Sequence, residues 1–226
     1  MCNDACMQFG ITYLSREDIH GRKIIEVGAL NVNGSLRSAM EGFGPSSYLG
    51  VDIAAGLGVD EICDINELTR RYGTERFDVV ISTELMEHVR NWRGAIINLK
   101  QILKPGGILL LTTRSAPFHY HGYPYDFWRY EVEDMEVIFS DFNIETIEKD
   151  PLAPGVFLKA KKPAGWHEND LTKVALHSMV KGRRCRNIRG FDILYFRTKR
   201  STRAFLSKIL PTSIKTFLKK IFRRED

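Results

Sequence analysis

Lys23-Ile24-Ile25-Glu26-Val27-Gly28 is a short run of β-forming residues that ends on glycine. Two similar runs follow, Tyr48-Leu49-Gly50-Val51-Asp52 and Phe77-Asp78-Val79-Val80-Ile81-Ser82, and each ends on a polar residue. A glycine lets the backbone approach a ligand closely, and an acidic residue about twenty positions later is where nucleotide-binding α/β folds bind a ribose diol. The three runs therefore predict a nucleoside cofactor lying across the carboxyl ends of parallel strands.

Apolar runs alternate with helical patterns through most of the chain. Strands are predicted at residues 24–27, 48–51, 59–62, 79–81 and 108–112, and helices at 35–41, 66–72, 92–103 and 131–139. A closing strand pair is predicted at 142–147 and 155–160. Strand–helix alternation produces right-handed crossovers and a parallel sheet. The expected fold class is α/β, a Rossmann-like, doubly wound sheet.

Charge divides the 226 residues into two parts. Residues 1–163 contain 17 basic and 23 acidic residues, whereas residues 164–226 contain 16 basic and five acidic ones. We therefore expect a catalytic-type domain at 1–163 and a basic, partly amphipathic helical extension at 164–226, and such asymmetry indicates an anionic partner for the extension. No apolar run reaches the roughly 18 residues of a membrane span. The four scattered cysteines and the lack of a secretory pattern predict a cytoplasmic protein with reduced thiols.

Six motifs in order resemble the class I S-adenosylmethionine-dependent methyltransferases, specifically the type 11-like group. They are Glu26-Val27-Gly28, Gly50-Val51-Asp52, Cys63-Asp64-Ile65, Phe77-Asp78-Val79-Val80, Leu85-Met86-Glu87-His88-Val89 and Leu103-Lys104-Pro105-Gly106-Gly107, and the resemblance covers residues 22–160. It implies S-adenosyl-L-methionine as cofactor and a seven-stranded, mostly parallel sheet with an antiparallel final hairpin. The implied cofactor-binding residues are Glu26, Gly28, Asp52, Ile53, Asp64, Ile65 and Thr83.

Each implied contact has a chemical reason. Glu26 braces the loop or receives the cofactor ammonium, Asp52 accepts hydrogen bonds from the ribose hydroxyls, and Asp64 accepts from the adenine amino group with Ile65 against the ring. Both aspartates could instead be strand-end or helix-cap acids. The glycine-rich loop departs from the family pattern because Gly28 and Gly34 are its only glycines, so we expect Asn31 and Asn33 to adopt left-handed conformations in their place.

Glu84-Leu85-Met86-Glu87-His88 could hold a divalent metal. If the segment is helical, Glu84 lies on the same face as Glu87 and His88, and these three could bind Mg²⁺, Mn²⁺ or Zn²⁺, with His119 or His121 as a fourth ligand. The pattern is similar to metal-assisted 2′-O-methyltransferases of small RNAs and to polyprenyl-catechol O-methyltransferases. The alternative is that Glu87 and His88 only shape the cofactor pocket, as they do in many relatives without a metal.

The aromatic segment 118–130 follows the fifth strand and should lie over the cofactor cleft. Its histidines make it a candidate acceptor site, with His121 as the expected base and His119, Glu87 and His88 as further catalytic candidates. The alternative is a hydrophobic lid in which Asp126 and Arg129 form a structural ion pair.

In residues 164–226 a helix is predicted at 171–180, and an apolar stripe at helical spacing is split by Pro211 into two short helices. These C-terminal helices could bind an anionic membrane surface at the inner face of the membrane, pack on the sheet or a second copy, or, less favoured, bind nucleic acid. The expected activity is O-methylation of a small-molecule, glycan or lipid-linked acceptor. The alternatives are an RNA 2′-O-methyltransferase with a basic RNA-binding tail and a non-catalytic cofactor-fold scaffold.

Overall fold

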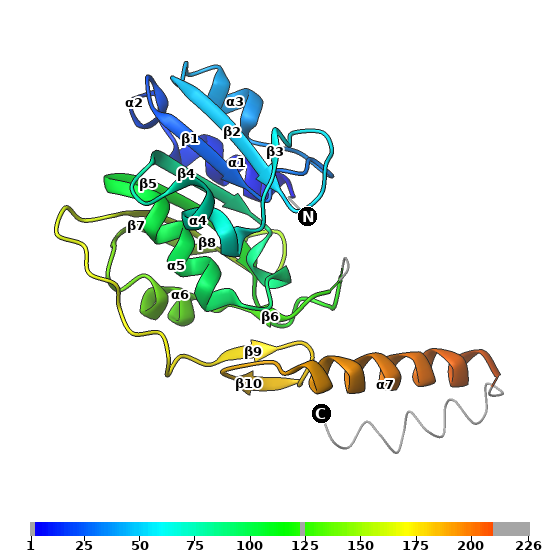
Figure 1. Cartoon of the computed structure of the whole chain (residues 1–226). Helices are drawn as coiled ribbons and strands as arrows, with labels where there is room; N and C mark the ends of the chain where they lie inside the picture. The colour runs from blue at the N-terminus through cyan, green and yellow to red at the C-terminus, as the bar shows by residue number, and fades with distance from the viewer. Residues whose placement is uncertain (1–2, 123–124, 210–226) are drawn as a thin grey trace. The chain divides into compact units, whose positions relative to one another are not determined.

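A computed structural model describes residues 3–122 and 125–209. Its central feature is a seven-stranded sheet in the order β3-β2-β1-β4-β5-β8-β7 (Figure 1). Strands β1 to β5 pair in parallel, and β8 runs antiparallel to both β5 and β7. The strands are β1 Lys23–Val27, β2 Ser47–Asp52, β3 Glu61–Ile62, β4 Phe77–Thr83, β5 Leu103–Arg114, β7 Asn143–Lys149 and β8 Gly155–Lys161. The predicted fold class and the antiparallel hairpin are confirmed.

Helices cover both faces of this sheet (Figure 1). One face packs against α1 and α3 in a cluster that includes Phe9, Met40, Val79, Ile81 and Phe157. The helical elements of this unit are α1 Asp4–Tyr13, α2 Arg16–Ile19, α3 Arg37–Glu41, the 3₁₀ turns η1 Ile65–Glu67 and η2 Met86–His88, α4 Leu68–Tyr72, α5 Trp92–Ile102 and α6 Val132–Ile138. The sequence patterns assigned no element to α1. Its start is marked by Asn3, whose side chain accepts from the Cys6 N–H.

Residues 164–186 belong to the first compact unit, which extends to Arg186. They contain β9 Leu176–Ser178 and β10 Arg183–Cys185, which form a second sheet with β6 Trp128–Arg129. The helix predicted at 171–180 is wrong, because Leu176–Ser178 pairs with β6 and β10 instead. The predicted domain boundary after Pro163 lies just beyond the last strand of the main sheet, β8. That the cofactor-binding domain ends there stays a prediction.

A buried lysine on α5 connects residues 164–186 to the helices beside the main sheet. The Lys100 ammonium is fully buried and donates to the Ile138 carbonyl oxygen at 2.6 Å, to Asp141 at 2.7 Å and to the Asn169 side-chain oxygen at 3.0 Å. Burial lowers the pKa of Lys100, while the Asp141 carboxylate opposes that shift. Asp141 also accepts from the Trp166 indole N–H at 2.8 Å. The Lys100–Asp141 pair therefore joins α5 to the turn after α6, and hydrogen bonds to Asn169 and from Trp166 attach the chain after Pro163 to this pair.

Residues 187–226 form a separate unit. Its described part contains α7 Gly190–Ile209, which begins well before the first helix of the predicted stripe. Four large apolar side chains on α7 are about two-thirds exposed: Phe191, Leu194, Tyr195 and Phe205. The second predicted helix, after Pro211, lies outside the described residues. Within residues 3–122 and 125–209, no helix has both the length and the apolar character needed to cross a bilayer.

We predict that Asp141→Asn lowers the free energy of unfolding by about 3 kcal/mol, because it leaves the Lys100 ammonium buried without its counter-charge. Equilibrium urea unfolding measures the change. Glu136→Gln is the control, since Glu136 is an exposed carboxylate on α6 that is not among the charges acting on Lys100. Its effect should stay within about 0.5 kcal/mol. An equal decrease in the free energy of unfolding in the two variants would show that the buried ion pair does not stabilise the fold more than an exposed carboxylate does.

Candidate functional site

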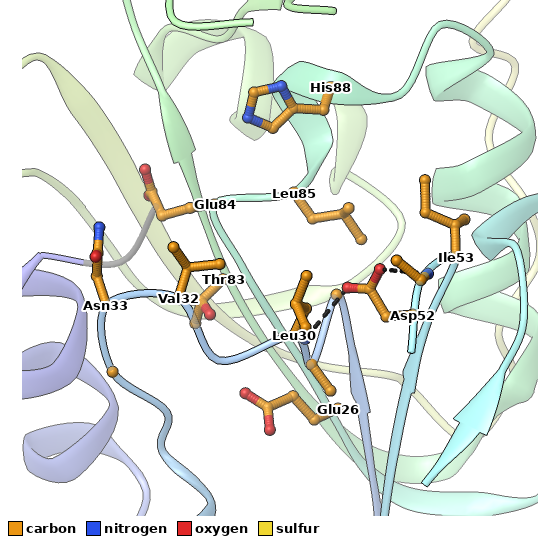
Figure 2. Close-up of a pocket in the computed structure, with 14 residues that line it drawn as sticks. Glu26, Leu30, Val32, Asn33, Asp52, Ile53, Thr83, Glu84, Leu85 and His88 are labelled. Atoms are coloured by element: carbon orange, nitrogen blue, oxygen red, sulfur yellow. Dashed lines mark hydrogen bonds between the residues drawn. The ribbon is translucent and has the colours of Figure 1, made fainter. Parts of the chain in front are cut away.

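A pocket that is partly open to solvent lies at the carboxyl ends of β1, β2 and β4. Figure 2 shows Glu26, Asp52 and His88 around it. Five of the seven predicted cofactor-binding residues line this pocket: Glu26, Gly28, Asp52, Ile53 and Thr83. Adjacent strands bring together side chains that are up to 57 positions apart in the sequence, because the carboxyl ends of parallel strands share one edge of the sheet.

Gly28 forms the turn at the end of β1. Its φ is +85°, in the region that glycine adopts without strain, and a Cβ there would lie 3.1 Å from Leu85. The N–H groups of Gly28 and Ala29 both donate to the Val51 carbonyl oxygen, at 2.9 and 3.0 Å. The turn is thereby fixed to β2, and the backbone can run close to a ligand in the pocket.

The loop after Gly28 differs from the prediction. Gly34 has φ +129°, but neither Asn31 nor Asn33 is left-handed, so the expected substitution of asparagine for glycine is wrong. Asn31 stabilises the loop with its side chain, which accepts from the Gly34 N–H at 2.9 Å. Its own N–H donates to the Leu57 carbonyl oxygen at 2.8 Å. Hydrogen bonds of the Asn31 side chain and backbone therefore fix the course of this loop, in place of the left-handed asparagine conformations that were expected.

Asp52 ends β2 and is held by backbone donors. Its two carboxylate oxygens accept from the N–H groups of Leu30 at 3.2 Å and Ala54 at 3.1 Å. Figure 2 shows both hydrogen bonds and the neighbouring Ile53 side chain, which is 65% exposed at the pocket. These two bonds leave each oxygen a further lone pair for donors from a ligand.

Glu26 is the buried acid of the pocket, with 2% of its surface exposed. It accepts hydrogen bonds from the Tyr48 hydroxyl at 2.8 Å and the Ser35 hydroxyl at 3.3 Å. Burial raises the pKa of Glu26 to about 7, although these hydrogen bonds and the charge of Arg37 act in the opposite direction. A buried carboxylate that is oriented by two hydrogen bonds suits a cationic ligand group, because the positive charge would stabilise the ionised form of Glu26.

The predicted adenine contacts do not line this pocket. Asp64 caps η1, accepting from the Asn66 N–H at 2.8 Å, and Ile65 is buried with 5% of its surface exposed. The helix-cap alternative therefore describes Asp64 in this structure. A role for either residue in adenine binding stays a prediction.

Glu84 occupies a left-handed conformation, with φ +53°, directly after β4. Its carboxylate pairs with Arg114, which also donates to Asp150 at 2.9 Å, and it accepts from the Cys6 thiol at 3.4 Å. Burial, with the charge of Glu87 and the Cys6 thiol, raises the pKa of Glu84 well above its usual range. Sequence patterns missed Arg114 and Cys6, since neither belongs to a motif.

Glu87, His88 and His121 form the second cluster of the site. One ligand atom from each lies within 4.8 Å of the other two. Glu84 is not a member, so the predicted metal set of Glu84, Glu87 and His88 is not brought together. The expected helical spacing does not apply, because the strained Glu84 precedes a single 3₁₀ turn at Met86–His88. His121 reaches the cluster from the loop after β5.

Two carboxylates flank the His121 ring. Nδ1 lies 3.0 Å from Asp126, and Nε2 lies 3.6 Å from Oε1 of Glu87. Burial alone would lower the pKa of His121, but these carboxylates raise it to about 9. Burial alone would raise the pKa of Glu87, but the neighbouring histidines hold it at about 2. At neutral pH the ring carries its proton, so the predicted role of His121 as a base requires that this proton first leave.

The aromatic segment has two parts. Phe127, Trp128 and Tyr130 are buried core residues around β6, and Asp126 forms the predicted ion pair with Arg129, at 2.5 and 2.6 Å. The earlier residues are more accessible: His119 is exposed and stacks on Phe118 at 4.6 Å between ring centroids. Residues 123 and 124 lie outside the described residues. The hydrophobic alternative thus holds for 127–130.

Comparison with known proteins agrees with this geometry. A family model described as a methyltransferase domain matches residues 6–150. The mitochondrial ubiquinone biosynthesis O-methyltransferase of Rattus norvegicus is 30% identical over 112 residues, covering 42% of this chain and 31% of that protein. The chain thus spans about a third of that relative's length.

Solved structures show the same fold. An S-adenosylmethionine-dependent methyltransferase from Mesorhizobium loti aligns with a TM-score of 0.53 and 17% identity, over 70% of this chain and 99% of that one. A 1,6-didemethyltoxoflavin-N1-methyltransferase from Burkholderia thailandensis, solved with its acceptor and S-adenosylhomocysteine, aligns with a TM-score of 0.58 and 13% identity, over 71% and 80% of the two chains. The chain therefore belongs to the methyltransferase-domain family and has the fold of S-adenosylmethionine-dependent methyltransferases.

Proposed function

We propose that this protein transfers a methyl group from S-adenosylmethionine to an oxygen of a small-molecule, glycan or lipid-linked acceptor. The observation that carries the proposal is the pocket in which Gly28, Glu26 and Asp52 meet at one edge of the sheet. The cofactor, when bound, supplies an activated methyl group on a sulfonium centre.

The residues present fit that cofactor. Asp52 offers two oriented carboxylate oxygens to the ribose hydroxyls, and Glu26 offers a buried carboxylate to the ammonium. Gly28 gives the chain room where a Cβ would contact Leu85. Thr83 and Leu85 line the same pocket at the end of β4, so the reacting centre would lie towards His88.

An oxygen acceptor is supported by the O-methyltransferase relative and by the charged cluster beside the pocket. In the transfer, the acceptor hydroxyl would release its proton to water at the open side of the pocket, its oxygen would bond to the methyl carbon, and the cofactor sulfur would keep the electron pair of the broken carbon–sulfur bond. The protein contributes alignment of the two reactants. A labelled-donor assay on lipid-linked sugars, catechols and structured RNAs tests the acceptor class, and methylation of RNA alone would favour the alternative RNA 2′-O-methyltransferase.

The exposed face of α7 supports peripheral binding to an anionic membrane, which would bring the enzyme to a lipid-linked acceptor. Phe191, Leu194 and Phe205 recur at helical spacing, and Arg197 and Arg200 fall elsewhere around the helix. Exposed aromatic and aliphatic residues with flanking cations are typical of helices that lie in the interface of a bilayer.

We predict that Asp52→Asn weakens binding of S-adenosylhomocysteine by roughly 100-fold, because two charge-assisted hydrogen bonds together contribute about 3 kcal/mol. Isothermal titration calorimetry measures the affinity. Glu67→Gln, which removes a half-exposed carboxylate paired with Arg70 outside the pocket, should bind like the wild type. Unchanged affinity in a folded Asp52→Asn variant would remove the basis of the proposal, and no binding to the wild type would support the non-catalytic scaffold.

We also predict that affinity for S-adenosylhomocysteine falls about tenfold between pH 8 and pH 6. Burial raises the pKa of Glu26 to about 7, and Tyr48, Arg37 and Asp60 are the titratable groups that act on it. The cationic ammonium of the ligand binds the ionised form of Glu26. Below pH 7 the Glu26 carboxyl must lose its proton before the ligand binds, which lowers the affinity by up to tenfold per pH unit. Glu26→Gln should bind more weakly at pH 8 and lose this slope. An identical slope in both proteins would assign the pH dependence to another group.

For α7 we predict that the full chain sediments with vesicles containing about 30% phosphatidylserine and not with pure phosphatidylcholine vesicles. Leu194→Asp should weaken this binding at least tenfold, since a buried leucine contributes about 1.5–3 kcal/mol. Leu152→Asp is the control, because Leu152 is as exposed as Leu194 but lies in the first unit. Equal binding of the two variants, or salt-sensitive binding to RNA alone, would contradict membrane association.

A further inference from the structure

The cluster of Glu87, His88 and His121 contains three ligand atoms that converge on one point. Nε2 of His121 and Nε2 of His88 lie 3.6 and 3.8 Å from Oε1 of Glu87. A tetrahedral Zn²⁺ with bonds of about 2.0–2.1 Å separates its ligand atoms by roughly 3.4 Å. All three ligand atoms lie within 4.8 Å of one another, so inward movements of the side chains would place them in the coordination sphere of one ion.

The opposite side of each ligand is already held. His88 donates from Nδ1 to the Tyr125 carbonyl oxygen at 2.6 Å, and Nδ1 of His121 lies 3.0 Å from the Asp126 carboxylate. The other oxygen of Glu87 accepts from the Thr113 hydroxyl at 2.9 Å. Metal-binding histidines nearly always have such a partner on the second ring nitrogen, because it fixes the ring and directs Nε2 to the metal.

The converging atoms, by contrast, lack hydrogen-bond partners. Within the described part of the chain, Oε1 of Glu87 and Nε2 of His121 are buried and make no hydrogen bond, although the Glu87 side chain is fully buried and that of His121 is nine-tenths buried. Buried polar atoms are rarely left unsatisfied, and a bound ion is one accepted explanation when they are. The two atoms lie 3.6 Å apart.

We propose that Glu87, His88 and His121 form a binding site for one divalent metal ion of the Zn²⁺ type. Two imidazoles and one carboxylate are the donor set of catalytic zinc sites, whereas Mg²⁺ prefers sites built from oxygen alone. Glu84 is excluded from the set because its carboxylate pairs with Arg114.

The site would also have a place for substrate. Three protein ligands leave at least one coordination position open, and His88 lines the cofactor pocket. This part of the inference rests on the proposed function: a hydroxyl-bearing acceptor would bind the metal through its oxygen, which lowers the pKa of that hydroxyl and promotes loss of its proton. The acceptor oxygen would then lie beside the methyl donor.

Titration of the metal-stripped full chain with ZnCl₂ by calorimetry, with metal analysis after desalting, tests the site. We expect one Zn²⁺ per chain, and a loss of affinity of at least about 10-fold in His88→Ala and in His121→Ala. His119→Ala is the matched control, since its exposed ring lies two positions from His121 and outside the cluster, and it should bind like the wild type. Co²⁺ added to the wild type should give visible absorption bands that Zn²⁺ displaces.

Two outcomes would overturn the proposed metal site. The first is absence of stoichiometric Zn²⁺ binding by the wild type. The second is equal Zn²⁺ affinity in His119→Ala and His121→Ala, which would show that Glu87 and His121 form an ion pair only. Far-ultraviolet circular dichroism checks that His121→Ala is folded. Because the zinc titration needs no cofactor, failure of cofactor binding in the wild type would reject the proposed function and leave the metal result standing.

Discussion

The turn at Gly28 is the constraint on which the site depends. The Val51 carbonyl oxygen accepts from two successive N–H groups of this turn, so the end of β1 is fixed against the end of β2. The same junction brings the Leu30 N–H to Asp52, which orients the carboxylate. A side chain at position 28 would meet Leu85, which belongs to the segment carrying Glu84 and Glu87. One small residue thus sets the spacing between the cofactor side and the charged side of the pocket.

Buried ion pairs hold the other side of the site. Arg114 pairs with Glu84 and Asp150, while Arg129 pairs with Asp126, which in turn contacts His121. These side chains are almost wholly inaccessible, and a buried charge persists only when its partner is also fixed. The loop carrying His121 is therefore anchored by electrostatics, whereas the cofactor side is anchored by backbone hydrogen bonds.

Much of this arrangement is predictable from sequence, because short β-forming runs that end on glycine or aspartate specify both the strands and the edge where they end. The order of motifs predicted β1, β2, β4 and the antiparallel pair. Tertiary contacts account for what was missed. Residues 171–180 have a helical pattern but pair as strands with Trp128–Arg129, and α1 is defined by packing against the sheet. The backbone conformation of Glu84 keeps its carboxylate out of the cluster with Glu87, and His121, which lies 34 positions after Glu87, completes the cluster instead.

The central claim is that an adenosine group binds at the tips of β1 and β2 through Asp52. A crystal structure of the protein with S-adenosylhomocysteine tests it most directly. The account predicts both ribose hydroxyls within hydrogen-bond distance of the Asp52 carboxylate and the amino-acid end of the ligand next to Glu26. A ligand bound at another edge of the sheet, or a ribose that makes no contact with Asp52, would contradict it.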